Sequence, residues 1–174
     1  SGRTSPGITA AAGVGSWGRR EVETTYGHAD GNVDVFLSAE YQKEKGWRDH
    51  SPSDIRRVFG KLGWSSANTE WSVSMTHADN QLTGNGLVPE AMLESRRRSV
   101  YTYPDETDPT LNFIKLAGSH DFSNGWTLAG NVYYRRLRLD TFNGDAEYDD
   151  DDDQYEGEAR RTRSTQTTTG IGLQ

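Results

Sequence analysis

The chain has 174 residues, a formal net charge of -7 and no cysteine, so disulfides and thiolate metal sites are excluded and a nucleic-acid partner is disfavoured. A mean hydropathy of -0.86 would ordinarily indicate a weak core or disorder. However, five Trp, eight Tyr and five Phe are residues that favour strands. No run of about 18 apolar residues exists, which excludes a transmembrane helix.

The first half of the chain contains five segments in which apolar and polar side chains alternate. The clearest is 33–42, where Val33, Val35 and Leu37 share one face of the strand and alternate with Asp34 and Phe36 on a second, mostly polar face. A strand places successive side chains on opposite faces, so this period of two predicts strands. The five predicted strands are residues 5–15, 19–26, 33–42, 55–65 and 70–81.

The second half adds a long hairpin and a terminal strand. Two alternating segments, 111–122 and 126–142, are separated only by Ser123-Asn124-Gly125, which predicts a tight turn. Both arms reach the roughly 9–11 residues that a tilted strand needs to cross a bilayer. Residues 164–174 form the eighth predicted strand.

The connections between these strands alternate in length. We predict short turns at 27–32, 66–69 and 123–125, and long loops at 46–54, 82–110 and 143–163. Short turns at one rim and long loops at the other are typical of outer-membrane barrels. The aromatic side chains agree, because one group lies beside the short turns and a second lies nearer the other rim. The first group is Tyr26, Trp64, Trp71, Phe122 and Trp126, and the second is Tyr41 and Tyr134.

We therefore predict an all-β fold, an antiparallel up-and-down transmembrane β-barrel in which each strand has a lipid side and a lumen side. The predicted lipid-facing residues are Val35, Leu37, Leu62, Val73, Leu116, Leu128 and Val132. The predicted lumen-facing residues are Asp34, Glu40, Lys61, Lys115, Asn131 and Arg135. A soluble β-sandwich would show similar alternation, and the asymmetry of the loops favours the barrel.

Two patterns could indicate chemistry, and both have a simpler interpretation. Residues 13–18 match the dinucleotide-binding fingerprint, which requires a following helix, but residues 19–26 alternate as a strand. We interpret the segment as a glycine-rich strand end. The four histidines, at 28, 50, 77 and 120, are far apart without ligand spacing, and no nucleophile elbow is present, so we predict neither a metal site nor an enzyme.

Two of the long loops carry charge that could bind a ligand. Asp149–Asp153 could coordinate Ca²⁺, but the EF-hand spacing is absent, and a solvated acidic loop is favoured. In the other loop, Glu90 to Arg98 is predicted to be helical, with Pro89 at the first position and Arg96, Arg97 and Arg98 near the C-terminal end of the helix dipole. Tyr101 and Tyr103 follow. This loop could hold an anionic chelate or present charge to lipopolysaccharide, and the sequence leaves both open.

Three segments carry a family resemblance: Gly46-Trp47-Arg48-Asp49, Leu82-Thr83-Gly84-Asn85-Gly86 and Asn131-Val132-Tyr133-Tyr134-Arg135-Arg136. With the strand and loop series, the chain resembles the barrel of a TonB-dependent outer-membrane receptor. That resemblance implies a barrel of about 22 strands around an N-terminal plug. Residues 1–174 would then be the N-terminal part of the barrel, about eight meandering strands, without the plug domain, the TonB box or the remaining strands.

The resemblance implies energised uptake of a scarce nutrient at the cell outer membrane, most often a ferric siderophore or similar chelate. The implied partners are outer-membrane lipid, the TonB complex acting through the plug region, and a siderophore-like ligand, with no cofactor and no nucleic acid. Ligand contacts are expected from the extracellular loops. The candidate residues are Trp47, Arg48, Arg96, Arg97, Arg98, Tyr101 and Tyr103. The alternative is a complete small eight-stranded outer-membrane barrel with a structural or adhesive role.

Overall fold

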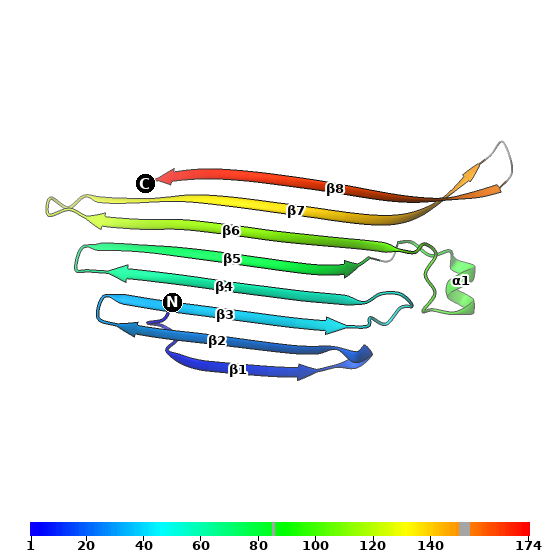
Figure 1. Ribbon diagram of the computed structural model, residues 1–174, viewed down its shortest axis with the longest axis horizontal. Helices are drawn as coiled ribbons and strands as arrows, with labels where there is room; N and C mark the ends of the chain where they lie inside the picture. Colours follow the sequence, from blue (N-terminus) through cyan, green and yellow to red (C-terminus); the bar gives the residue numbers. More distant parts are fainter. Residues whose placement is uncertain (85, 150–153) are drawn as a thin grey trace.

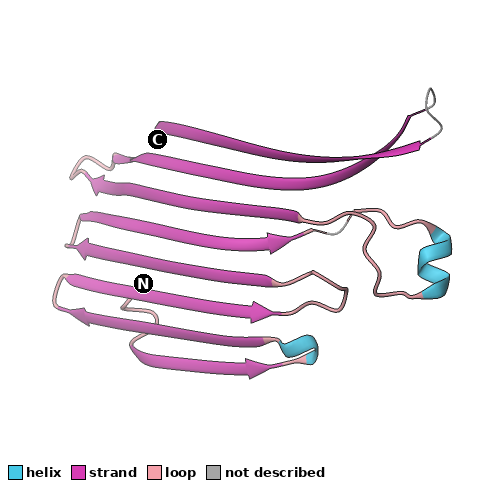
Figure 2. Cartoon of the chain, turned by 45° about the vertical axis from the view of Figure 1, so that its right-hand side comes forward, coloured by secondary structure: helices cyan, strands magenta, loops and turns pink. Residues whose placement is uncertain are grey.

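The computed structural model describes residues 1–84, 86–149 and 154–174 and shows one antiparallel sheet of eight strands in sequence order (Figure 1). The sheet is open, with β1 at one edge and β8 at the other (Figures 1 and 2). The predicted eight-stranded antiparallel meander is confirmed. The strands are β1 (Gly7–Val14), β2 (Arg20–Asp30), β3 (Val33–Glu44), β4 (Ser53–Ser65), β5 (Thr69–Thr83), β6 (Asp105–Asp121), β7 (Thr127–Asp149) and β8 (Gln154–Leu173).

The connections lie at two rims of the sheet. At the short rim the strands are joined by residues 31–32, 66–68 and 122–126, and Gly31 and Gly125 adopt positive φ angles of 52° and 86°. At the long rim they are joined by residues 15–19, 45–52 and 84–104 and by the tip of the β7–β8 hairpin. The predicted difference between the rims is confirmed for the connections 45–52 and 84–104, whereas the first connection of the long rim, 15–19, is no longer than the short-rim turn at 122–126.

The strands extend further into the predicted long loops than the sequence indicated. The loop predicted at 82–110 is 84–104, and the one predicted at 46–54 is 45–52. The prediction of a loop at 143–163 is wrong, because β7 and β8 stay paired from Asn143 and Arg160 to Asp149 and Gln154. Two paired strands satisfy each other's backbone groups without an apolar face, so alternation is not required there. Of the acidic run, Asp149 ends β7 and residues 150–153 lie outside the described residues, so a Ca²⁺ site there stays untested.

Two local predictions are settled by the backbone. The helix expected over Glu90 to Arg98 is α1 (Glu90–Ser95), with Pro89 at the N-cap and Arg96 already extended at φ -160°. The three arginines therefore follow the helix and do not lie in its last turn, so that part of the prediction is wrong. Residues 13–18 lead through a 3-10 turn at Ser16–Gly18 into β2, which confirms a strand end in place of a nucleotide loop. In the described residues, α1 is too short and polar to cross a membrane.

The register of the strands defines two faces of the sheet, which we name after neighbouring residues of β6. The Leu116 face includes a continuous cross-strand row of six apolar side chains: Val35, Leu62, Val73, Leu116, Val132 and Ile171. The Lys115 face carries Lys61, Lys115, Asp34 and Asn131. Each side chain assigned above to the lipid or the lumen side falls on the matching face, so the predicted partition is confirmed.

The sheet has almost no core of its own. Among the described residues, Ala78 is the one buried hydrophobic side chain, whereas Leu37 and Leu116 on the Leu116 face are 48% and 46% exposed. Contiguous exposed apolar surface of this extent is rare on soluble monomers and marks contact with a membrane or another protein. The Leu116 face thus requires an apolar environment outside the chain.

The apolar surface of the Leu116 face ends along an oblique line, which we call the apolar edge. On each strand, counted from the short rim towards the long rim, we take the last apolar side chain before the first polar one. From β3 to β8, this residue lies nearer the short rim than on the preceding strand, or level with it. These residues on β3 to β8 are Tyr41, Val58, Met75, Ile114, Tyr134 and Ile171. In the register, the edge falls by two residues from β3 to β4, from β4 to β5 and from β7 to β8.

The slope of the apolar edge gives the tilt of the strands. From β3 to β8 the edge shifts by six residues along the strands over five steps between strands. At roughly 3.3 Å per residue and 4.8 Å between strands, this shift corresponds to a tilt of about 40°. Strands of transmembrane barrels tilt by about 35–45° relative to the barrel axis. The pattern of side chains alone therefore has the geometry of an apolar slab crossed by tilted strands.

The polarity of the two faces exchanges beyond the apolar edge. There the Leu116 face becomes polar, and the Lys115 face carries a row in which Ala78, Leu111 and Leu137 are neighbours. Ile55, Leu82 and Leu139 lie on the same face nearby and are partly buried. Towards the long rim, the wall therefore has the polarity of a protein in water, with apolar side chains on the inside.

The open edges predict how residues 1–174 behave when separated from any other strands. Both β1 and β8 leave a row of backbone donors and acceptors without strand partners, which lipid cannot satisfy. We expect the isolated chain, refolded in detergent, to aggregate or stay unfolded. A compact monomer whose gel mobility changes on heating, with all eight strands protected from hydrogen exchange, would contradict this expectation.

Candidate functional site

Three connections of the long rim approach one another, and we call the side chains that meet there the loop cluster: Trp17, Trp47, Arg48, Asp49, His50, Arg96, Arg98 and Tyr103. In a meander, alternate connections lie at the same rim, so segments distant in sequence become neighbours (Figure 1). The contacts are direct, since the backbone N–H of Lys45 donates to the carbonyl oxygen of Trp17 at 3.0 Å. The N–H of Asp49 donates to the carbonyl oxygen of Arg98 at 2.9 Å.

Asp49 is the centre of the loop cluster. Its Oδ2 lies 2.8 Å from Nη2 of Arg96, and its Oδ1 lies 3.8 Å from Nε of Arg98. The carboxylate is 24% exposed, whereas the two guanidinium side chains are 62% and 52% exposed. One carboxylate therefore holds two cations on the long loop, and parts of both guanidinium groups remain open to a ligand.

Aromatic rings accompany the cations. The guanidinium carbon of Arg48 lies 5.0 Å from the ring centroid of Trp47, and that of Arg98 lies 5.7 Å from the ring of Trp17. The ring of Tyr103 lies 4.3 Å from that of His50. Planar cations beside exposed indole and phenol rings can bind a ligand that is both anionic and aromatic, through paired hydrogen bonds and stacking.

The structure brings five of the seven predicted ligand-binding residues into the loop cluster. They are Trp47, Arg48, Arg96, Arg98 and Tyr103. Tyr101 instead lines an adjacent cavity of about 820 Å³ with Leu87 and Val88. Arg97 is exposed in the same loop, and none of the contacts just described involves it.

Sequence reasoning missed Trp17, Asp49 and His50. The sequence predicts Trp17 only as part of a glycine-rich strand end, although the order of the strands places that segment at the same rim as the two loops. Asp49 is an acid that directly follows Trp47 and Arg48 in one loop, and the other loop carries the basic run 96–98. This pair of opposite charges is the sequence signal for a contact between the loops. Contact between His50 and Tyr103 depends on the path of two irregular loops and had no sequence signal.

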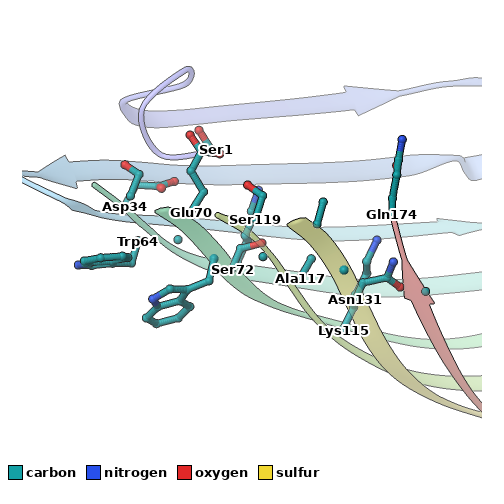
Figure 3. A pocket seen from close by; sticks show the side chains of 18 of the residues that line it. Ser1, Asp34, Trp64, Glu70, Ser72, Lys115, Ala117, Ser119, Asn131 and Gln174 are labelled. Atoms are coloured by element: carbon teal, nitrogen blue, oxygen red, sulfur yellow. The ribbon is translucent and has the colours of Figure 1, made fainter. Parts of the chain in front are cut away.

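A second concave region lies on the Lys115 face near the short rim, with a volume of about 590 Å³ (Figure 3). Its lining alternates in charge, with Asp34, Glu70 and Lys115, and includes the small side chains of Ser72 and Ala117. The lining also includes Trp64 and Trp71, so charged, small and aromatic side chains share one broad surface, which suits contact with a protein surface.

The first residues of the chain lie against this region. The N–H of Gly2 donates to Oδ1 of Asp34 at 2.9 Å, and Nε of Arg3 lies 3.8 Å from Oδ2 of the same carboxylate. Asp34 is only 7% exposed. The approach is so close that a Cβ added to Gly27 would lie 1.8 Å from the carbonyl oxygen of Ser5. Residues 1–5 are therefore fastened to the β2–β3 hairpin on the Lys115 face.

Charged groups beyond the apolar edge influence one another. Hydrogen bonds, from Arg163 first and also from Arg138, lower the pKa of Asp140 on the long-rim part of β7. Burial, with the neighbouring carboxylates of Glu106, Asp140 and Asp79, raises the pKa of Asp108. These groups face the surroundings on the Leu116 side and lie outside the loop cluster.

The described residues contain no group of three or more His, Cys, Asp or Glu side chains able to hold a metal ion. Two histidines are engaged in polar contacts between strands. Nδ1 of His77 lies 2.9 Å from Oδ1 of Asn112, and Nδ1 of His120 lies 2.7 Å from the hydroxyl of Thr69.

The fold is that of a section of barrel wall of the TonB-dependent receptor type, an open antiparallel sheet with one apolar and one polar face. In particular, the chain is similar to the ferric-catecholate import receptor Fiu of E. coli K12. The open form matches with a TM-score of 0.73 and 16% identity, covering 98% of this chain and 31% of that chain. The closed form matches with a TM-score of 0.72 and 17% identity, covering 97% of this chain and 27% of that chain.

Comparisons of sequence add nothing to the structural likeness, since no family model and no curated protein matches the chain significantly. At these identities the likeness establishes the fold alone. The chain spans less than a third of the receptor that it resembles.

The central role of Asp49 predicts the effect of its replacement. In Asp49→Asn the two arginines lose their shared counter-ion, so we expect faster hydrogen exchange in residues 90–99, by no more than about fivefold because exposed ion pairs contribute little. Exchange in β3 to β6 should not change. Asp30→Asn, the same charge change at the short rim, is the control. Equal exchange rates in residues 90–99 for Asp49→Asn and wild type would show that Asp49 does not hold the loop.

Proposed function

We propose that residues 1–174 form the N-terminal part of the barrel of an outer-membrane TonB-dependent receptor that imports a scarce nutrient. The observation that carries this proposal is an open sheet with an oblique apolar surface, superimposable over 98% of its length on an import receptor. An apolar face crossed at about 40° fits a membrane-embedded wall, and the polar Lys115 face fits a wet lumen. In this orientation the long rim is extracellular and the short rim periplasmic.

The proposal includes partners that act through parts of the protein outside residues 1–174. The family resemblance implies a plug inside the barrel, on which the TonB complex acts to drive transport. The polar, small-residue concavity on the Lys115 face supports this, since it offers a broad surface for a domain seated in the lumen. We assign neither plug nor coupling residues to the chain itself.

For the nutrient we propose an iron chelate of the siderophore type. The support is the loop cluster at the rim assigned to the outside, where the guanidinium groups of Arg48 and Arg98 lie beside exposed indole rings and that of Arg96 is held by Asp49. Anionic chelates with aromatic groups match this chemistry. The similar protein Fiu is a ferric-catecholate import receptor, which points in the same direction. Arg97 and Tyr101 remain proposed contacts at the border of the cluster.

The alternative of a complete eight-stranded barrel is not favoured. In a closed barrel β1 would pair with β8, whereas here they form opposite edges of the sheet (Figure 1). The structures that resemble the chain are transport receptors, which agrees with a role other than catalysis.

The orientation of the sheet can be tested with spin labels on β3. A label at Leu37 on the Leu116 face should be more accessible to oxygen dissolved in lipid, and a label at Glu40 on the Lys115 face to a water-soluble quencher. The measurement requires the protein that contains this chain, folded in membranes. Equal accessibility of both labels to the lipid-soluble quencher would rule out the proposed wall.

The role of the loop cluster can be tested by uptake. Cells that depend on this receptor for a ferric catecholate should lose most uptake with Arg48→Gln/Arg98→Gln, because the two cations of the cluster that lie beside indole rings are removed. The control is Arg160→Gln/Arg161→Gln, the same change of charge on β8 at the same rim. Unchanged uptake in the first variant would exclude these cations as ligand contacts, and equal loss in both would indicate a general effect of charge.

A further inference from the structure

The side chains directly beyond the apolar edge form a belt on the Leu116 face. We define the belt as the first polar side chain past the edge on each strand from β3 to β8, together with Arg20 on β2, which pairs with Lys43. On β2 the apolar side chains of this face are interrupted by Thr24, and Arg20 follows the last of them, Val22. Its members are Arg20, Lys43, Arg56, His77, Asn112, Arg136 and Thr169. Four of the seven carry a permanent positive charge, and none is a carboxylate. The chain as a whole has 26 acidic against 19 basic residues, so the belt runs against the composition.

The belt follows the apolar edge and not a row of the sheet. In the register, Lys43 on β3 lies four residues nearer the long rim than Arg136 on β7. Nevertheless, on its strand each is the next side chain of this face after the tyrosine that ends the apolar surface. A set of cations that shifts with the apolar surface from strand to strand is placed with respect to the membrane. It is not explained by pairing between neighbouring strands.

The belt is only partly neutralised by the protein. Within the described residues, Nε of Arg56 lies 3.0 Å from Oδ1 of Asp54, which stands one outward-facing position further from the edge. Lys43, Arg20 and Arg136 are exposed and form none of the ion pairs within the described part of the chain. Around Arg136, the cross-strand neighbours are the amide of Asn112 and the hydroxyl of Thr167, both able to donate hydrogen bonds.

On the long-rim side of the apolar surface, the carboxylates of the same face begin beyond the belt. The nearest are Asp54, Asp79 and Asp140, and Asp140 is engaged by Arg138 and Arg163. Glu106 and Asp108 lie further still towards the long rim. The order from the apolar edge outwards is thus aromatic or aliphatic side chains, then cationic or uncharged polar ones without a carboxylate, then mixed charge.

We propose that the belt binds the phosphate groups of anionic lipid headgroups in the leaflet on the long-rim side. Cations placed directly past an apolar slab meet the headgroup layer, where guanidinium groups bind phosphate oxygens through paired hydrogen bonds. Each Lys or Arg near an anionic lipid surface shifts partitioning by about fivefold. This proposal uses only the membrane orientation of the sheet from the proposed function, and not the transported nutrient.

The test compares two triple variants of the protein that contains this chain. Arg20→Gln/Lys43→Gln/Arg136→Gln removes the unpaired cations of the belt. Lys61→Gln/Lys115→Gln/Arg135→Gln removes the same charge from the Lys115 face at neighbouring positions. Each protein is reconstituted in nanodiscs that contain a bisphosphorylated glucosamine glycolipid and its dephosphorylated form in equal amounts. Lipids retained after mild detergent extraction are counted by native mass spectrometry, and heat-dependent gel mobility confirms folding.

We expect wild type and the Lys115-face variant to retain the phosphorylated lipid preferentially, and the belt variant to lose that preference by about tenfold or more. The single change Arg136→Gln, less demanding for folding, should lose about fivefold. Loss of preference in the Lys115-face variant to the same extent would overturn the proposal, as would an unchanged preference in the belt variant.

Two further arms separate the source of the phosphate and the proposed function. If inorganic phosphate at millimolar concentration removes the preference, the belt is a site for free anions and the proposal fails. If the spin labels on β3 contradict the membrane orientation, the proposed function fails. If only the uptake of the chelate is absent, the lipid result remains valid, because no residue of the belt belongs to the loop cluster.

Discussion

The structure depends on the antiparallel hydrogen-bonded ladder, because there is no core to hold it together. A soluble domain of this length would bury much of its apolar surface within itself, whereas here one small side chain, Ala78, is the buried hydrophobic residue in the described part of the chain. The backbone groups are satisfied strand by strand from β1 to β8. In lipid, an unpaired backbone group costs several kcal/mol, so the ladder becomes the dominant constraint. The polarity of the side chains then determines which surroundings each face can contact.

That constraint explains why the faces can exchange polarity along a single strand. On β7, Val132 and Arg136 lie on the same face, and Asn131 and Leu137 lie on the other. A strand that is stabilised by its own core could not make this exchange without losing its packing. Here the ladder continues across the exchange, and the residues change where the surroundings change. One boundary between apolar and polar surroundings accounts for three features: the apolar edge, the belt, and the apolar side chains of the Lys115 face near the long rim.

Much of the fold was predictable from the sequence, because apolar and polar side chains alternate wherever one face of the sheet is apolar and the other polar. The faces of Leu37, Lys61 and Leu116 follow from parity alone. The prediction failed where both faces are polar, as in the paired residues 143–149 and 154–160, since a polar pair of strands has no alternation to detect. In the candidate site, the exposed arginines and tyrosines were visible as composition. Their arrangement around Asp49 was not, because it depends on two irregular loops and on the 3-10 turn of Trp17.

The attachment of the first residues has a mechanical consequence. Residues 1–5 touch the wall mainly through Gly2 and Arg3 on the single carboxylate of Asp34, whereas β2 and β3 are joined along their whole length. A force applied to the N-terminal end would act on the few contacts with Asp34 alone, whereas the many hydrogen bonds of the ladder would share a force between them. The segment would therefore detach at low load and leave the sheet intact. The force would then pass to β1, which begins at Gly7 and is paired only with β2 in the described sheet.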